Sequence, residues 1–172
     1  MLMVDVLTAG FSALEAHLPK RRPSHPRPQN HARGLHKGSS PRISMLTISR
    51  LVRLAGGTNL HTGSYVGKMS RDVSENDQSR EALRWDCYGL KRVFSAASGG
   101  VHQGKVAGNL DGYGIDCIVQ AGGGVHGHPD GTTAGARAMI QAVRSWTSGV
   151  SIQEYAQTHG ELKRALGRWG LD

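Results

Sequence analysis

Two glycine-rich segments in the second half of the 172-residue chain have the composition of an anion-binding site. Each follows an apolar stretch: residues 98–100 (SGG) come after residues 93–97, and residues 122–124 (GGG) come after residues 117–121. Glycine allows backbone N–H groups to turn toward an anion, because no Cβ stands in the way. The pair therefore favours a phosphate cradle, with two ordinary tight turns as the alternative.

Lys68 and His61 are the side chains that could act on such an anion. Lys68 lies in the sequence GSYVGKM, where a lysine on a mobile loop could neutralise charge that develops on a bound substrate. His61 ends a predicted strand, where an imidazole could bind phosphate or relay a proton. A solvated surface lysine and a structurally hydrogen-bonded histidine are the alternatives.

Other residues that can bind metals or react as nucleophiles form no cluster in the sequence. His126 and His128 have the H-x-H spacing of some metal sites, but no further group of ligands accompanies them. Cys87 and Cys117 are expected to be free thiols that pack in the fold, in a reducing compartment. The first residues lack the basic start of a signal peptide. We therefore expect a cytoplasmic protein with no metal ligands in this chain.

The elements that must position these residues alternate between strands and helices. This alternation is typical of βα units with a parallel sheet, in which ligands bind at the carboxyl ends of the strands. No apolar run has the roughly 18 residues that a membrane span needs. The pattern predicts strands over residues 2–7, 58–61, 93–97 and 117–121, and helices over residues 11–16, 46–55, 74–85, 105–110 and 132–146, with two short helices in residues 152–169.

The positive charge of the chain is concentrated in residues 17–42. The formal net charge is +8, from 21 basic and 13 acidic residues. Residues 17–42 hold seven of the basic residues, five of the six prolines and no acidic residue. The rest of the chain therefore holds 14 basic and 13 acidic residues and is nearly neutral. Such a composition predicts a loop or a disordered linker. A nucleic-acid-binding arm is the alternative, but no aromatic residue is interleaved for base stacking.

Three motifs, taken in order, resemble one known family. HTGSYVGKM, ASGGVH and IVQAGGGVHGHPDGTTAGARAM are similar to the large subunit of ribulose-bisphosphate carboxylase/oxygenase (RuBisCO), and the archaeal form III branch is the most similar. The resemblance runs from about Ile43 to the C-terminus and includes residues 1–16 (MLMVDVLTAGFSALEA). It implies an α/β fold, a partial (β/α)8 TIM barrel. Strand four and the start of its helix would be residues 1–16, strands six to eight residues 43–149, and C-terminal helices residues 150–172.

The resemblance also implies a role for each matching residue. Lys68 takes the place of the loop-six lysine, which closes over the substrate and stabilises the carboxylation transition state. His61 takes the place of a histidine that contacts a substrate phosphate. The SGG residues would bind a substrate hydroxyl and a phosphate, and the QAGG residues would hold the other phosphate with backbone amides. The implied substrate-binding set is His61, Ser98, Gly99, Gly100, Gln120, Ala121, Gly122 and Gly123.

The metal-binding part of the family pattern is not in this sequence. In the family, a carbamylated lysine and an Asp-Glu pair hold the Mg²⁺ that polarises the enediolate. The resemblance thus implies part of a lyase that carboxylates ribulose 1,5-bisphosphate, in carbon dioxide fixation or nucleotide salvage, as a homodimer or larger oligomer. It also implies that this chain is inactive alone. A RuBisCO-like enolase of methionine salvage is an alternative, against which Lys68 argues. A non-catalytic phosphate-binding or subunit-pairing protein is another.

The strand-five motif of the family, His-x-His-Arg followed by Met-His, should fall within residues 17–42 and is absent there. Permitted codons for residues 25–42, read one nucleotide later, encode Ile-His-Val-His-Arg-Thr-Met-His-Gly-Ala-Phe, which is that motif. We therefore infer two compensating frameshifts around this segment. A divergent linker is the alternative.

Overall fold

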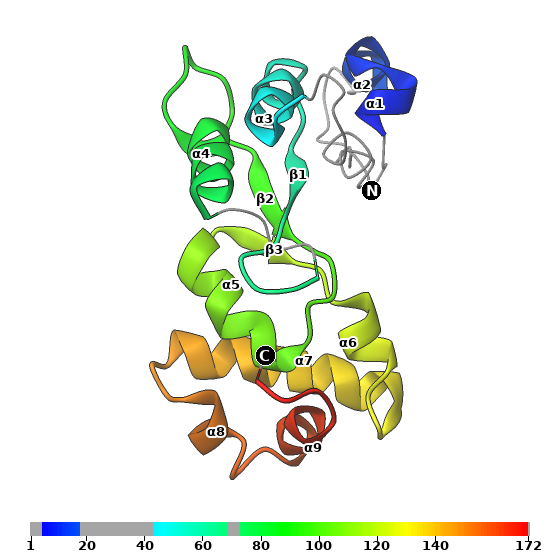
Figure 1. Cartoon of the computed structure of the whole chain (residues 1–172), viewed down its shortest axis with the longest axis vertical. Helices are drawn as coiled ribbons and strands as arrows, with labels where there is room; N and C mark the ends of the chain where they lie inside the picture. The colour runs from blue at the N-terminus through cyan, green and yellow to red at the C-terminus, as the bar shows by residue number, and fades with distance from the viewer. Residues whose placement is uncertain (1–4, 18–42, 69–72, 172) are drawn as a thin grey trace. The chain divides into compact units, whose positions relative to one another are not determined.

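The computed structural model describes residues 5–17, 43–68 and 73–171 (Figure 1). The prediction of a disordered or frameshifted segment at residues 17–42 falls almost wholly outside these residues and stays a prediction. The chain divides into two compact units, whose boundary passes through the first two strands. The first unit is Met1–Thr62 with Asp72–Ala96, and the second is Gly63–Arg71 with Ala97–Asp172.

Three strands form the sheet in the described residues. They are β1 (Asn59–Gly63), β2 (Phe94–Ala97) and β3 (Cys117–Val119), hydrogen-bonded in the order β1-β2-β3. The Phe94 amide donates to the Thr58 carbonyl and the Ser98 amide to the Gly63 carbonyl, both at 2.9 Å, so β1 and β2 run parallel. The α/β class is confirmed. The prediction of barrel strands four to eight goes beyond these three strands.

The first unit begins with two short helices, α1 (Val6–Ala9) and α2 (Phe11–His17). The predicted strand over residues 2–7 is wrong for its last two residues, because Val6 and Leu7 lie in α1. The Asp5 carboxylate accepts the Leu7 amide at 3.0 Å and caps this helix, while Val6 is buried. Residues 1–4 lie outside the described part of the chain. A short apolar run does not distinguish a strand from a buried helical turn.

Helices α3 (Met45–Leu54) and α4 (Val73–Arg84) confirm the predicted helices in this unit. The Ser44 hydroxyl accepts the Thr47 amide at 3.2 Å, which starts α3 where the sequence places its N-cap. Met45, Ile48 and Val52 then face inward at helical spacing. The apolar core of the unit consists of Val6, Leu14, Met45, Ile48, Val52, Leu60, Leu83 and Val93.

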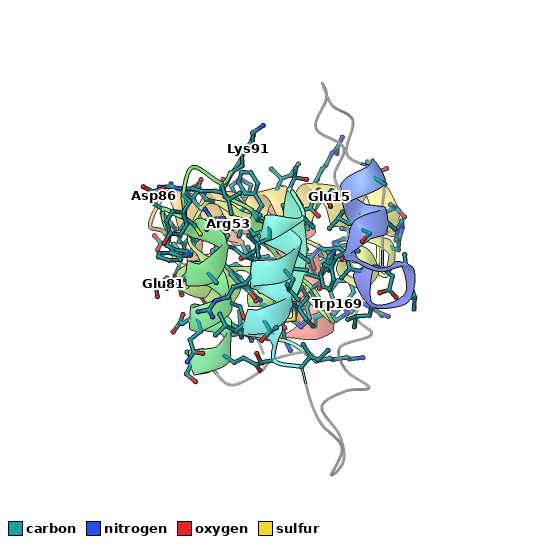
Figure 2. The ribbon with its side chains drawn as sticks, turned by 90° about the horizontal axis from the view of Figure 1, so that it is seen from above. Glu15, Arg53, Glu81, Asp86, Lys91 and Trp169 are labelled. Carbon is teal, nitrogen blue, oxygen red and sulfur yellow. The ribbon has the colours of Figure 1, made fainter. Side chains whose placement is uncertain are left out.

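Arg53 joins α3 to the end of α4 and to the loop that leads to β2 (Figure 2). Its side chain is 4% exposed, and its guanidinium donates to four backbone carbonyls at 2.8–3.0 Å. The planar fork of arginine suits this arrangement, since its donors point in several fixed directions. The four acceptors are the carbonyls of Ala82, Trp85, Leu90 and Lys91.

The second unit is mostly helical. Its apolar core joins Val106 and Leu110 to Ala142, Ala156 and Leu162. The helices predicted over residues 105–110, 132–146 and 152–169 are confirmed. The GGG residues, predicted as a loop, instead form the first turn of a helix. The elements are η2 (Gln103–Lys105), α5 (Val106–Tyr113), α6 (Gly122–His126), α7 (Gly131–Thr147), α8 (Ile152–Tyr155) and α9 (Gly160–Trp169).

Polar side chains fasten α9 to α7. Gln141 donates to the Glu161 carboxylate at 2.9 Å and accepts the Leu162 amide at 3.0 Å. An ion pair between Arg164 and Asp130, at 2.8 Å, adds a second connection. The Gln141 hydrogen bond, a backbone hydrogen bond and the nearby Arg137 together hold the pKa of Glu161 below its ordinary value.

Helices that could cross a bilayer are absent from the part of the chain that the structure describes, since none is both long and apolar enough.

Candidate functional site

The two glycine-rich segments follow neighbouring strands of the sheet. The SGG segment (residues 98–100) follows β2, and the QAGG segment (residues 120–123) follows β3. The Gln120 amide donates to the Ala97 carbonyl at 2.9 Å, which sets the ends of the two strands level with each other. Both segments therefore lie at the carboxyl edge of the sheet, as predicted from the sequence.

The SGG segment requires glycine at both of its glycine positions. Gly99 and Gly100 have φ angles of +100° and +73°, which L-residues with a Cβ rarely adopt. A Cβ on Gly100 would also lie 2.8 Å from Cγ of Lys68. Ser98, at the start of the segment, is buried and donates its amide to the Gly63 carbonyl. The backbone here turns sharply and leaves room for a lysine side chain.

Lys68 contacts the SGG segment with both its backbone and its side chain. Its amide donates to the Gly99 carbonyl at 2.9 Å, and the aliphatic part of its side chain lies over Gly100. The side chain as a whole is exposed. The stem of a lysine commonly covers a surface in this way while its ammonium group stays in water. The structure thus brings together Lys68 and the SGG segment, which the sequence predicts to share a site.

The QAGG segment leads into the first turn of α6. Gln120 is exposed, Ala121 is the N-cap, and Gly122 and Gly123 have nothing within 4 Å of where a Cβ would stand. First-turn amides of a helix have no acceptor within the helix, so they are available to an external one. A Cβ on Gly124 would lie 2.8 Å from the Val101 carbonyl oxygen, so α6 packs closely on the chain that follows the SGG segment.

His61 is placed in β1, in the first unit, whereas the residues above belong to the second. It is 8% exposed, and its side chain or backbone already interacts with another group of the protein. A contact with a substrate phosphate stays a prediction for this residue.

Both histidines of the H-x-H pair, His126 and His128, make hydrogen bonds within the fold. His128 accepts the Asp130 amide at 3.0 Å on Nδ1, and its Nε2 is 2.9 Å from the Glu161 carbonyl, to which it donates in that tautomer. His126 lies 3.3 Å from the Thr132 hydroxyl. The two ring nitrogens of His128 therefore connect the start of α7 to the start of α9. Both cysteines, Cys87 and Cys117, are free thiols.

The residues around Lys68 do not fit a magnesium ion. Mg²⁺ prefers carboxylate, phosphate and water oxygens, whereas this site offers a lysine, backbone amides and a serine. Among the described residues, no three His, Cys, Asp or Glu side chains gather where they could hold a metal. The same set of cationic and N–H groups suits the oxygens of a phosphate.

Sequence reasoning missed Asn109, which lies at the base of the segment that carries Lys68. Its side chain is fully buried and hydrogen-bonds to that segment. The available signal was an asparagine between the buried Val106 and Leu110, in a helix where asparagine is a poor helix former.

Comparisons with known proteins agree on one family. The family model described as "Ribulose bisphosphate carboxylase large chain, catalytic domain" matches residues 1–169. Ribulose bisphosphate carboxylase of Methanocaldococcus jannaschii is 38% identical over 98% of this chain, and that of Pyrococcus furiosus is 36% identical over 98%. The matches cover 43% and 41% of those two proteins, so the chain spans about two-fifths of the length of these curated relatives.

Solved structures of similar fold include carboxylases and a related protein. The octameric enzyme of Pyrococcus horikoshii, described as a complex with sulfate ion, superposes with a TM-score of 0.88 at 34% identity, covering 99% of this chain and 41% of that one. The dimeric enzyme of Hyperthermus butylicus gives 0.83 at 33% identity, over 99% and 43%. A rubisco-like protein of Alicyclobacillus acidocaldarius gives 0.85 at 28% identity, over 98% and 43%.

Proposed function

Since the chain belongs to the family of RuBisCO large chains, we propose that it supplies the phosphate-binding segments and the loop-six lysine of a form III ribulose 1,5-bisphosphate carboxylase. The observation that carries this proposal is the contact of Lys68 with Gly99 and Gly100, at the sheet edge where the QAGG segment also begins. A lysine and two sets of glycine amides at one sheet edge match a substrate with two phosphates.

Each part of the site has a distinct task in this proposal. The SGG segment binds one phosphate and a substrate hydroxyl, and the QAGG segment binds the other phosphate with the first-turn amides of α6. His61 contacts a phosphate as well. The Lys68 ammonium neutralises the negative charge that forms when carbon dioxide adds to the substrate. Its exposed position allows it to meet a ligand without loss of a buried contact.

We do not assign the Mg²⁺-dependent step of the family's reaction to this chain alone. In the family pattern, a carbamylated lysine and an Asp-Glu pair hold the ion, and this sequence lacks that motif. We therefore expect no carboxylation by the 172-residue chain by itself. Incorporation of labelled carbon dioxide into an acid-stable product, with Mg²⁺ and ribulose 1,5-bisphosphate supplied, would disprove this expectation.

Calorimetric binding of ribulose 1,5-bisphosphate tests the proposed site. Lys68→Met should weaken binding by about fivefold to tenfold, because one charge-assisted contact is lost. Lys163→Met, which removes an exposed lysine from α9, is the matched control and should leave the affinity unchanged. Equal affinities for all three proteins, or no binding by the parent chain, would contradict the proposal.

A RuBisCO-like enolase is the second candidate function, and the similarity to the rubisco-like protein of Alicyclobacillus acidocaldarius supports it. Lys68 favours the carboxylase, because that lysine serves carboxylation in the family. A phosphate-binding or subunit-pairing protein without catalysis is a third candidate. The calorimetric test applies to its phosphate-binding form as well, because it measures affinity and not catalysis.

The solved relatives also suggest how the chain assembles. Those of Pyrococcus horikoshii and Hyperthermus butylicus are described as octameric and dimeric. We propose a homodimer or larger oligomer for this chain, in the cytoplasm. Light scattering of the purified chain tests the assembly, and a monomer at all concentrations would contradict it.

A further inference from the structure

One buried side chain holds the segment that leads to Lys68 against α5. Asn109 is fully buried. Its Oδ1 accepts the amides of Tyr65 and Val66, at 2.9 and 3.4 Å. Its Nδ2 donates to the carbonyls of Val66 and Lys105, at 2.9 and 2.8 Å. A single amide side chain thereby binds both backbone polar groups of Val66.

The surface of α5 is shaped to receive this segment. A Cβ on Gly108 would lie 2.7 Å from Cγ2 of Val66, and a Cβ on Gly112 would meet the ring of Tyr65. The Tyr65 ring also packs edge-on against Tyr113, with 4.6 Å between ring centroids. Glycine one residue before Asn109 and three residues after it therefore lets the backbone of the segment approach the helix closely.

Lys68 is separated from this attachment by one residue. Val66 is held by Asn109, Lys68 is held by the Gly99 carbonyl, and only Gly67 lies between them. A Cβ on Gly67 would lie 2.8 Å from the Gly99 carbonyl oxygen, so this residue is also closely packed. Two fixed points this near to each other leave the Lys68 backbone little freedom of direction.

We propose that Asn109 is a positioning residue for Lys68, which it directs over the SGG segment by fixing the backbone of Tyr65 and Val66 to α5. The role in substrate binding rests on the proposed function, whereas the positioning itself is a property of the free chain. An apolar residue of similar size at position 109 would remove hydrogen bonds from four partly buried backbone groups of the segment and its helix.

The first test measures the free chain by nuclear magnetic resonance. Asn109→Ala should speed hydrogen exchange of the Tyr65 and Val66 amides by about tenfold. It should also shift the ¹³C signal of a methyl label on the Lys68 amine, assigned with Lys68→Arg. Gln141→Ala is the matched control, because it removes another amide that accepts a backbone N–H, that of Leu162. It should leave the signals of Tyr65, Val66 and Lys68 unchanged.

A second variant disturbs the same contact while Asn109 stays in place. Gly108→Ala puts a methyl group against Val66. Alanine is the better helix former, so α5 itself gains stability. We expect the Lys68 signal to move in this variant as well, in a protein that remains folded. It therefore carries the test even if Asn109→Ala fails to fold. An unchanged Lys68 signal in Gly108→Ala, or in a folded Asn109→Ala, would overturn the proposal.

Binding of ribulose 1,5-bisphosphate separates a positioning role from general stability. Asn109→Ala should weaken binding about as much as Lys68→Met does, and adding it to Lys68→Met should cause no further loss. Losses that multiply in the double variant would overturn the proposal. If the parent chain does not bind this ligand, the proposed function fails, while the signals of the free chain still decide the positioning role.

Discussion

Individual glycines in the site have different physical requirements, although the sequence presents them alike. Gly100 combines a left-handed backbone with close contact to Lys68, whereas Gly122 lies in a helix with open space where a Cβ would stand. The sequence predicts that both belong to phosphate-binding segments. The sequence does not reveal which of the two glycines tolerates a side chain, because the backbone φ angle and the neighbouring atoms are set only in the folded chain.

The first prediction compares these two glycines. Gly100→Ala should lower the free energy of unfolding by about 1–2 kcal/mol or more, from the left-handed backbone and the contact with Lys68. Gly122→Ala should be neutral or slightly stabilising, because alanine is favoured in a helix. Urea unfolding measures both. Equal effects of the two substitutions would contradict the left-handed, closely packed geometry of Gly100.

The second prediction concerns Arg53. Arg53→Met should lower the free energy of unfolding by at least about 2 kcal/mol, because one buried and three partly buried carbonyls lose a charged donor. Arg53→Lys should recover only part of this loss, since an ammonium group does not reproduce the fork. Arg50→Met, at an exposed position of the same helix, is the control and should change stability by less than about 0.5 kcal/mol. Similar losses at both positions would refute the role of Arg53.

At the scale of elements, the long helices and most short elements were predictable, and two short segments were not. Ser44 as a cap and the helical spacing of Met45, Ile48 and Val52 identify α3 from the sequence alone. Val6 and Leu7 of α1 were predicted as strand, and the GGG start of α6 was predicted as a loop. The start of α1 has a local signal in its Asp5 cap, whereas the start of α6 packs Gly124 against the Val101 carbonyl, which no local pattern encodes.

The third prediction concerns the attachment of α9 to α7. The lowered pKa of Glu161, due first to its hydrogen bond from Gln141, means that the ionised form is favoured in the folded chain. The stability it contributes is present above the ordinary pKa of a glutamate and is lost as the pH falls through the lowered folded value. Glu161→Gln should therefore be less stable than the parent at neutral pH and equally stable in acid.

Glu154→Gln, on α8, serves as the control for this pH dependence. Urea unfolding across the acid range gives the comparison for all three proteins. A difference between parent and Glu161→Gln that is independent of pH would contradict the role of the ionised carboxylate.

At the scale of the whole molecule, the family and the α/β class followed from three motifs in a fixed order. The division of the described chain into two units did not, because its boundary passes through β1 and β2 rather than through a linker. The contribution of Asn109 was likewise hidden, since it depends on α5 meeting a segment more than forty residues earlier in the chain.

The fourth prediction concerns the gene. If two frameshifts surround residues 17–42, the nucleotide sequence read in the shifted frame should encode His-x-His-Arg followed by Met-His. Sequencing of the genomic DNA across these codons decides the matter. Codons that do not yield this motif in either alternative frame would favour a divergent linker instead.

We propose that the SGG and QAGG segments, with Lys68, bind the two phosphates of one substrate. Titration of the ¹⁵N-labelled chain with ribulose 1,5-bisphosphate tests it most directly, residue by residue. We expect saturable shifts of the Gly99, Gly100, Gly122 and Gly123 amides with one common dissociation constant, while amides of α8 stay unchanged. Shifts at only one of the two segments, or none at either, would contradict it.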